Sequence, residues 1–89
     1  MAKFYHVGIG FSGKAVDVEE IQNAFGPAGW ARYAPNCWIV YTDESPNLLV
    51  EKIRNLCASQ DGIFVCELNI SNNWGYLHKE IWDWIRQKT

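Results

Sequence analysis

The sequence has little positive charge and no long hydrophobic run. Its 89 residues carry eight Lys and Arg against ten Asp and Glu, a formal net charge of −2. The cationic excess that makes non-specific nucleic-acid binding easy is therefore missing. No apolar stretch approaches the roughly 18 residues that a membrane-spanning helix needs, and no cationic segment followed by an apolar one opens the chain. We expect no membrane partner and a cytoplasmic location.

Cysteine is scarce and is not arranged in pairs. Cys37, Cys57 and Cys66 are odd in number and form no C-x-x-C pair or Cys/His ligand spacing. This pattern argues against a disulfide framework and against a zinc site. We expect buried free thiols, no metal and no other cofactor.

Apolar residues, by contrast, are plentiful. The chain is 48% hydrophobic and 15% aromatic, which is enough for a packed core and excludes a disordered tail. Because burial scales with length, a chain of this size forms one domain, here residues 1–89.

Hydrophobic periodicity and capping residues predict the order of elements. Alternation over residues 3–10 predicts a strand with Tyr5, Val7 and Ile9 on one face. Asp17 and Glu20 form a capping box before a helix that Gly26-Pro27 ends. The further expected elements are strands over 30–33 and 37–41, a helix from Ser45-Pro46, a strand over 63–70 and a helix over 77–86.

This order is strand, helix, strand, strand, helix, strand and a terminal helix, which is the α+β, ferredoxin-like βαββαβ pattern. Right-handed crossovers place two helices on one face of a four-stranded antiparallel sheet. The other face must be hidden by the C-terminal helix or by a second copy. We expect a homodimer, with His6, Val65 and Glu67 on the uncovered face as candidate contacts.

A glycine-rich string follows the first strand and is the candidate ligand loop. It matches G-x-G-x-x-G and, apart from Ala15, a phosphate-binding loop. Both motifs need a helix directly after the loop and a parallel sheet, and the first helix begins only near Asp17. A flexible connection is the favoured interpretation, and a modest anion site is the alternative. Its candidate residues are Gly8, Gly10, Ser12, Gly13 and Lys14.

Two other residue types invite a chemical interpretation. Asp43 and Glu44 follow a strand and suit an acid/base or metal pair, although they also suit an ordinary helix entry. Five tryptophans would offer stacking surfaces for bases, but the cations are scattered among acids. Core and interface packing is the expected use of most of these rings, and a single exposed Trp would reopen the question.

Several segments together carry a family resemblance over the whole chain. They are Lys3-Phe4-Tyr5, Gly29-Trp30-Ala31, Cys37-Trp38-Ile39-Val40, Ile53-Arg54-Asn55-Leu56, Gln60-Asp61-Gly62-Ile63-Phe64-Val65 and Trp82-Asp83-Trp84-Ile85. In this order and spacing the chain resembles the SinR-like branch of the CRISPR-associated Cas-two-like proteins. The resemblance implies a small ferredoxin-like domain that pairs into dimers.

The resemblance also bears on activity. Members with proposed metal-dependent nuclease activity carry an Asp at the end of the first strand, and the matching residue here is Gly10. Without that carboxylate a hard cation loses its principal ligand, so no catalytic residue is assigned. The leading hypothesis is a non-catalytic, dimeric binding or assembly module for nucleic acid or a nucleotide. The alternatives are a phosphodiesterase using Asp43, Glu44 or Asp61 with Mg²⁺, and a structural module that binds only proteins.

Overall fold

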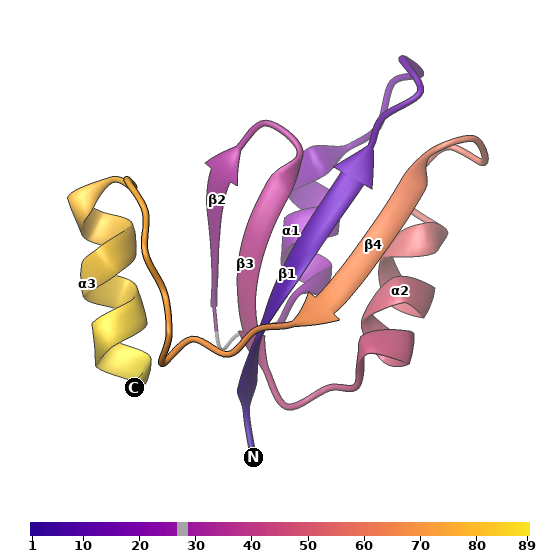
Figure 1. The fold of residues 1–89 in the computed structure, drawn as a ribbon. Coiled ribbons are helices and arrows are strands. Elements are labelled where there is room, and N and C mark those ends of the chain that lie inside the picture. The colour runs from indigo at the N-terminus through magenta and orange to yellow at the C-terminus, as the bar shows by residue number, and fades with distance from the viewer. Residues whose placement is uncertain (27–28) are drawn as a thin grey trace.

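The computed structural model describes residues 1–26 and 29–89 and contains four strands and three helices in the expected order. The elements, shown in Figure 1, are β1 (Lys3–Gly10), α1 (Val18–Ala24), β2 (Trp30–Ala34), β3 (Cys37–Thr42), α2 (Pro46–Arg54), β4 (Gly62–Glu67) and α3 (Lys79–Lys88). The sequence predicts that Gly26-Pro27 ends the first helix, and Pro27 of this pair lies outside the described residues.

Both central helices begin at the capping residues that the sequence indicates. The Asp17 carboxylate accepts hydrogen bonds from the backbone N–H groups of Glu19 and Glu20. The Ser45 hydroxyl accepts one from Leu48 N–H, and Pro46 occupies the first helical position. These bonds satisfy N–H groups that have no partner inside the helix, which is why the two start positions are predictable.

The strands form one antiparallel sheet in the order β2-β3-β1-β4. β1 lies between β3 and β4, and β2 and β4 are the edges. In Figure 1, α1 and α2 lie behind the sheet, whereas α3 lies apart from them at the β2 side. The predicted α+β domain with a four-stranded antiparallel sheet, two central helices and a terminal helix is confirmed.

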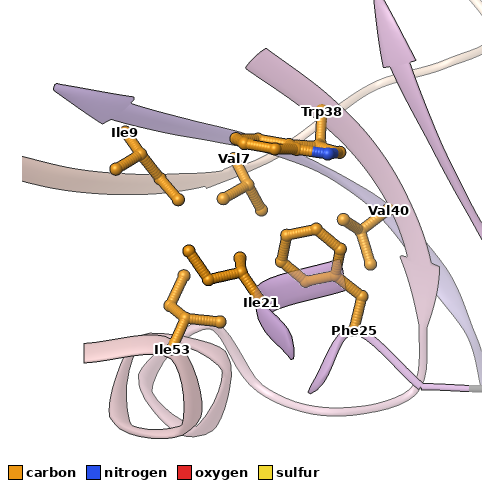
Figure 2. Packing of buried hydrophobic residues seen from close by; sticks show 7 residues of the cluster. All are labelled: Val7, Ile9, Ile21, Phe25, Trp38, Val40 and Ile53. Carbon is orange, nitrogen blue, oxygen red and sulfur yellow. The ribbon is translucent and has the colours of Figure 1, made fainter. Parts of the chain in front are cut away.

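The main core lies between the sheet and the two central helices. We call it the first cluster, and its buried residues are Val7, Ile9, Ile21, Phe25, Trp38, Val40 and Ile53. Figure 2 shows Ile21 from α1, Phe25 from the C-cap of α1 and Ile53 from α2 beneath the side chains of β1 and β3. Trp38 is completely buried, and its indole Nε1–H donates to Gln22 Oε1 at 3.1 Å. The indole thus fills the core without leaving its polar atom unpaired.

A second cluster of buried residues lies on the opposite face of the sheet and consists of Phe4, Ile39 and Ile85. Because Ile85 belongs to α3, this helix covers part of the face that the two central helices leave open. Gly29 makes the approach possible: its φ is +116°, and a Cβ there would lie 3.0 Å from Trp84 Nε1. The expectation that the C-terminal helix hides that face is therefore correct for part of the face.

Several element boundaries differ from the sequence-based prediction, by one to three residues. β4 ends at Glu67 rather than Ile70, and α3 begins at Lys79 rather than Leu77. Leu68, Ile70 and Leu77 all pack against the second cluster. Their apolar side chains therefore hold segment 68–78 against the sheet instead of extending β4 or α3. Tertiary packing has overridden the local pattern at both positions.

The cysteines are free, as expected, but they are not all buried. Cys37 and Cys57 are half-buried, and Cys66 is exposed, so the expectation of buried thiols is wrong for Cys66.

None of the described helices combines the length and the apolar character that crossing a bilayer requires.

Candidate functional site

A hollow opens between the sheet and the segment that links β4 to α3. Its volume is about 420 Å³, within the size range of small-ligand sites. His6 and Ile39 line it from the sheet, Tyr33 from β2, and Trp82 and Ile85 from α3. Segment 68–78 contributes the rest of the lining: Leu68, Asn69, Ile70, Asn72, Asn73, Trp74, Gly75, Tyr76 and Leu77. We call this space the aromatic hollow.

His6 and Tyr33 form a polar pair on the sheet side of the hollow. His6 Nε2 lies 2.6 Å from Tyr33 Oη, and the ring centroids are 5.8 Å apart. Burial raises the pKa of the Tyr33 phenol above its usual range, and the neighbouring Cys37 thiol adds to the effect. The phenol therefore keeps its proton at neutral pH, and the pair can offer a ligand both a donor and an acceptor.

The outer wall of the hollow is aromatic and exposed. Trp74 is 97% exposed and Tyr76 is 100% exposed, although large aromatic side chains are usually buried for most of their surface. Nearby, Asn69 Oδ1 accepts a hydrogen bond from Ser71 Oγ at 2.7 Å, and the Asn73 side-chain amide donates to the Ile70 carbonyl. These local bonds shape the loop that presents the two rings.

The hollow is nearly free of formal charge. Among the described residues that line it there is no Asp, Glu, Lys or Arg. A neighbouring hollow shares Tyr33 and Tyr76 with it and adds Arg32 and His78. Arg32 is already engaged, because its Nε donates to the Pro35 carbonyl at 3.1 Å and its guanidinium lies 5.1 Å from the Trp38 ring centre. Stacking and neutral hydrogen bonds are thus what this surface can offer a ligand.

The glycine-rich candidate site has a different geometry. Gly8 and Gly10 lie within β1 and pair with Phe64 and Gly62 of β4, so they belong to the sheet rather than to a loop. Ser12 N–H donates to Asp61 Oδ1 at 2.7 Å. An anion bound at this amide would meet a carboxylate, which opposes binding. Gly13 and Lys14 are exposed beyond it, and nothing in this geometry supports a phosphate cradle.

Asp61 is instead a structural carboxylate. Besides Ser12, it accepts a hydrogen bond from Ala58 N–H to Oδ2 at 2.9 Å. These bonds, that from Ser12 first, hold the pKa of the Asp61 carboxyl below its usual range. Asp61 thereby fastens the loop after β1 to the turn before β4.

Replacing Asp61 with Asn is expected to lower the melting temperature near neutral pH, because the amide turns a donor toward an N–H group that needs an acceptor. The folded pKa is depressed, so the stabilisation is present above the unfolded value of about 4 and is lost as the pH falls toward the folded value. Thermal melts over a pH series should show the difference between the two proteins shrink in acid, whereas Asp43→Asn should have little effect at any pH. A difference that is independent of pH would contradict this account.

The proposed phosphodiesterase carboxylates are not brought together. Glu44 Oε1 lies 2.5 Å from Lys52 Nζ, and Asp43 is exposed beside it. Asp61 lies at the opposite end of the sheet, because Gly62 pairs with Gly10 whereas Thr42 pairs with Lys3. Within residues 1–26 and 29–89, no group of three or more His, Cys, Asp or Glu side chains is placed to hold a metal ion.

The three candidate contacts for a dimer do not share one face. Tyr5 pairs with Glu67 and Val7 with Val65, and Val65 packs against the first cluster. Glu67 therefore lies on the helix-covered side, where it pairs with Lys3 at 3.4 Å. His6 faces the aromatic hollow on the other side. The prediction that Val65 and Glu67 lie on the uncovered face is wrong, since β4 turns its odd-numbered side chains toward the helices.

The residues that build the aromatic hollow were largely missed by sequence reasoning. Only His6 was singled out individually, and Trp74 was grouped with the other tryptophans. The available signal was Asn72-Asn73-Trp74-Gly75-Tyr76, in which two aromatic residues stand among turn-forming polar ones. No family model matches the chain, and comparison with curated proteins and with solved structures gives no match either.

Proposed function

We propose that the chain is a non-catalytic, ferredoxin-like binding module whose aromatic hollow takes a base of single-stranded nucleic acid or of a nucleotide. The βαββαβ order of the first six elements and the strand order β2-β3-β1-β4 support the ferredoxin-like assignment. They also agree with the resemblance to SinR-like, Cas-two-like proteins, which we retain as a proposal about descent.

One observation carries the ligand proposal: Trp74 and Tyr76 are almost completely exposed and belong to the same hollow as the His6–Tyr33 pair. Exposing large rings costs free energy unless a partner covers them. Single-stranded nucleic acids stack their bases on such rings. The amide of Asn72 and the His6–Tyr33 pair supply groups for the edge of a base.

The absence of Lys and Arg from the described lining decides how binding would depend on salt. Affinity that arises from phosphate contacts falls steeply with salt concentration. A hollow that offers rings and amides instead binds mainly by stacking, so the expected salt dependence is shallow. The net charge of −2 works in the same direction.

The non-catalytic part of the proposal rests on the position of the acids. Gly10 offers no carboxylate where the resembling nucleases place one, and Glu44 is paired with Lys52. Hydrolysis assisted by a divalent ion needs several oxygen ligands around one point, and the described acids are dispersed.

Replacing Trp74 with Ala is expected to weaken binding of short single-stranded RNA and DNA by about 1–3 kcal/mol, or roughly 5- to 150-fold, the usual worth of one stacked base. Fluorescence anisotropy with labelled homopolymers, repeated with mononucleotides as competitors and at several salt concentrations, measures this loss. Trp30→Ala is the matched control, because Trp30 is also exposed but pairs with Val40 of the helix-covered face.

Two results would reject the proposal. Wild-type protein that binds none of these ligands would show that the hollow has another occupant and would favour the purely structural role. Cleavage of RNA or DNA with Mg²⁺ or Mn²⁺, abolished by Asp43→Ala together with Glu44→Ala, would establish the phosphodiesterase alternative.

A further inference from the structure

One end of the open face of the sheet, the face opposite the first cluster, is formed by glycines. Val7 and Ile9 of β1 face the helices, and side chains alternate along a strand, so Gly8 and Gly10 lie on the open face. Gly10 pairs with Gly62 of β4. We call Gly8, Gly10 and Gly62 the glycine floor. In Figure 1, α3 lies at the β2 side of the sheet, whereas β4 forms the opposite edge.

The backbone does not require glycine at two of these positions. A Cβ at Gly62 would meet no atom within 4 Å beyond its chain neighbours, and one at Gly10 would meet only the Gly62 backbone nitrogen, at 3.9 Å. Neither residue has a positive φ. Glycine inside a strand weakens it and often marks a place where a ligand approaches closely. The two glycines therefore leave room above the sheet at some cost to the strands.

An exposed aromatic ring stands beside the glycine floor. Phe64 lies on the open face, because Ile63 and Val65 on either side of it pack against the first cluster. It pairs with Gly8 and is 65% exposed. Exposing a large ring costs free energy unless a partner covers it. Since Gly8 has no side chain, the ring is open to a flat group on the side of β1.

The floor continues from the aromatic hollow. His6 lines the hollow, and a Cβ at Gly8 would lie 3.3 Å from His6 Cε1. His6 pairs with Cys66, so Phe64 is its diagonal neighbour, about 7–8 Å away in a regular antiparallel pair. Successive nucleotides of an extended single strand can span such a step. A strand with one base in the hollow therefore brings the next base to Phe64.

The charges around this face do not oppose a polyanion. Among the strand residues that the structure describes, no Asp or Glu shares the open face, because Glu67 lies on the helix-covered side beside Lys3. Asp61, next to the floor, is buried, and its carboxylate accepts hydrogen bonds from Ser12 and Ala58 N–H. A phosphate on the open face therefore meets no acidic side chain of the sheet.

We propose that the ligand is a single strand of at least two nucleotides, with one base in the aromatic hollow and the next stacked on Phe64 above the glycine floor. This inference rests on the function proposed above and narrows it from any nucleotide to a strand. Four-stranded sheets of RNA-binding domains present rings to two or three bases. The second stack is expected to tighten binding roughly 5- to 150-fold, the range for one stacked base.

Dinucleotides that lack one base test this inference. By competition anisotropy, an intact dinucleotide should bind roughly 5- to 150-fold more tightly than the same molecule with an abasic residue at either position. The abasic ligands keep the sugar and the phosphate, so the difference reports the second base. Phe64→Ala should remove the difference without changing the affinity for the abasic ligands. Leu48→Ala, which removes an exposed apolar side chain from α2 behind the sheet, should preserve it.

Filling the floor gives a second, independent variant. Gly10→Val introduces a residue that favours strands where a Cβ has room, so the melting temperature should not fall. Its side chain takes space that the second base needs, and the advantage of the intact dinucleotide should shrink. In the wild-type protein, the amide resonances of Gly10 and Gly62 should shift on titration with the intact dinucleotide and stay in place with a mononucleotide.

Three results would overturn the inference. Equal affinity for intact and abasic dinucleotides, weakened in both cases by Trp74→Ala, would reject the second stack and leave the proposed function standing. No binding of any of these ligands would reject both. A dimer in sedimentation velocity that Phe64→Ala dissociates would show that a second copy covers the ring.

Discussion

Trp38→Ala is expected to lower the free energy of unfolding by about 3–5 kcal/mol, the usual cost of truncating a buried aromatic residue. The indole is fully buried in the first cluster and lies against Phe25, with ring centroids 5.8 Å apart. Its removal also leaves Gln22 without the hydrogen bond at 3.1 Å. A loss of this size is a large fraction of the roughly 5–15 kcal/mol that stabilises a typical domain.

Urea unfolding followed by far-ultraviolet circular dichroism measures this change. Trp74→Ala is the matched control, since the same side chain is deleted at a position that is 97% exposed; its expected effect lies within about 0.5 kcal/mol of zero. Similar losses of unfolding free energy in the two variants would mean that Trp74 is buried in solution. The aromatic hollow would then be closed.

Ile85→Ala is expected to release α3 locally, at a cost of about 2–5 kcal/mol to the docking of this helix. Ile85 is the buried residue of α3, and it joins the helix to Phe4 and Ile39 of the sheet. The other apolar contacts of the helix come from partly buried residues, among them Trp84, whose ring centroid lies 5.7 Å from that of Phe4. Its ion pairs do not hold it to the sheet, because Asp83 pairs with Lys79 and Arg86 of the same helix. Such exposed pairs within one helix add little.

Hydrogen exchange distinguishes local release from general unfolding. Amides of Lys79–Lys88 should lose protection in Ile85→Ala while those of β1 and β3 keep theirs. Ile53→Ala makes the same chemical change in the first cluster and should weaken protection throughout the domain. Uniform loss in both variants would show that the two clusters unfold as one unit.

Most of the fold was predictable because its signals are local. The side chains of Asp17 and Ser45 accept hydrogen bonds from N–H groups of the first helical turn. The fixed backbone conformation of Pro46 suits the first position of a helix. Alternation placed Val7 and Ile9 on one face of β1, and both are buried in the first cluster. These features depend on neighbours within a few residues, which a sequence displays directly.

The faces of β4 were predicted wrongly because the sequence offers two plausible sets. Phe64, Cys66, Leu68 and Ile70 form an apolar series, whereas Val65 alternates with charged Glu67. The apolar series turned out to serve the open face, where Leu68 and Ile70 meet α3. The mixed set faces the helices, and Glu67 reaches the solvent beside Lys3.

The amino-acid sequence by itself determined the order of the strands and helices, the capped starts of α1 and α2, and the absence of a carboxylate at Gly10, since each depends on residue types and short spacings. Only the tertiary structure decided that Asp61 binds the loop after β1, and that His6, Tyr33, Trp74 and Tyr76 line one hollow. These residues stand up to 70 positions apart (6 to 76) and meet because α3 docks on the open face. Docking depends on side-chain packing across the sheet, which no local pattern encodes.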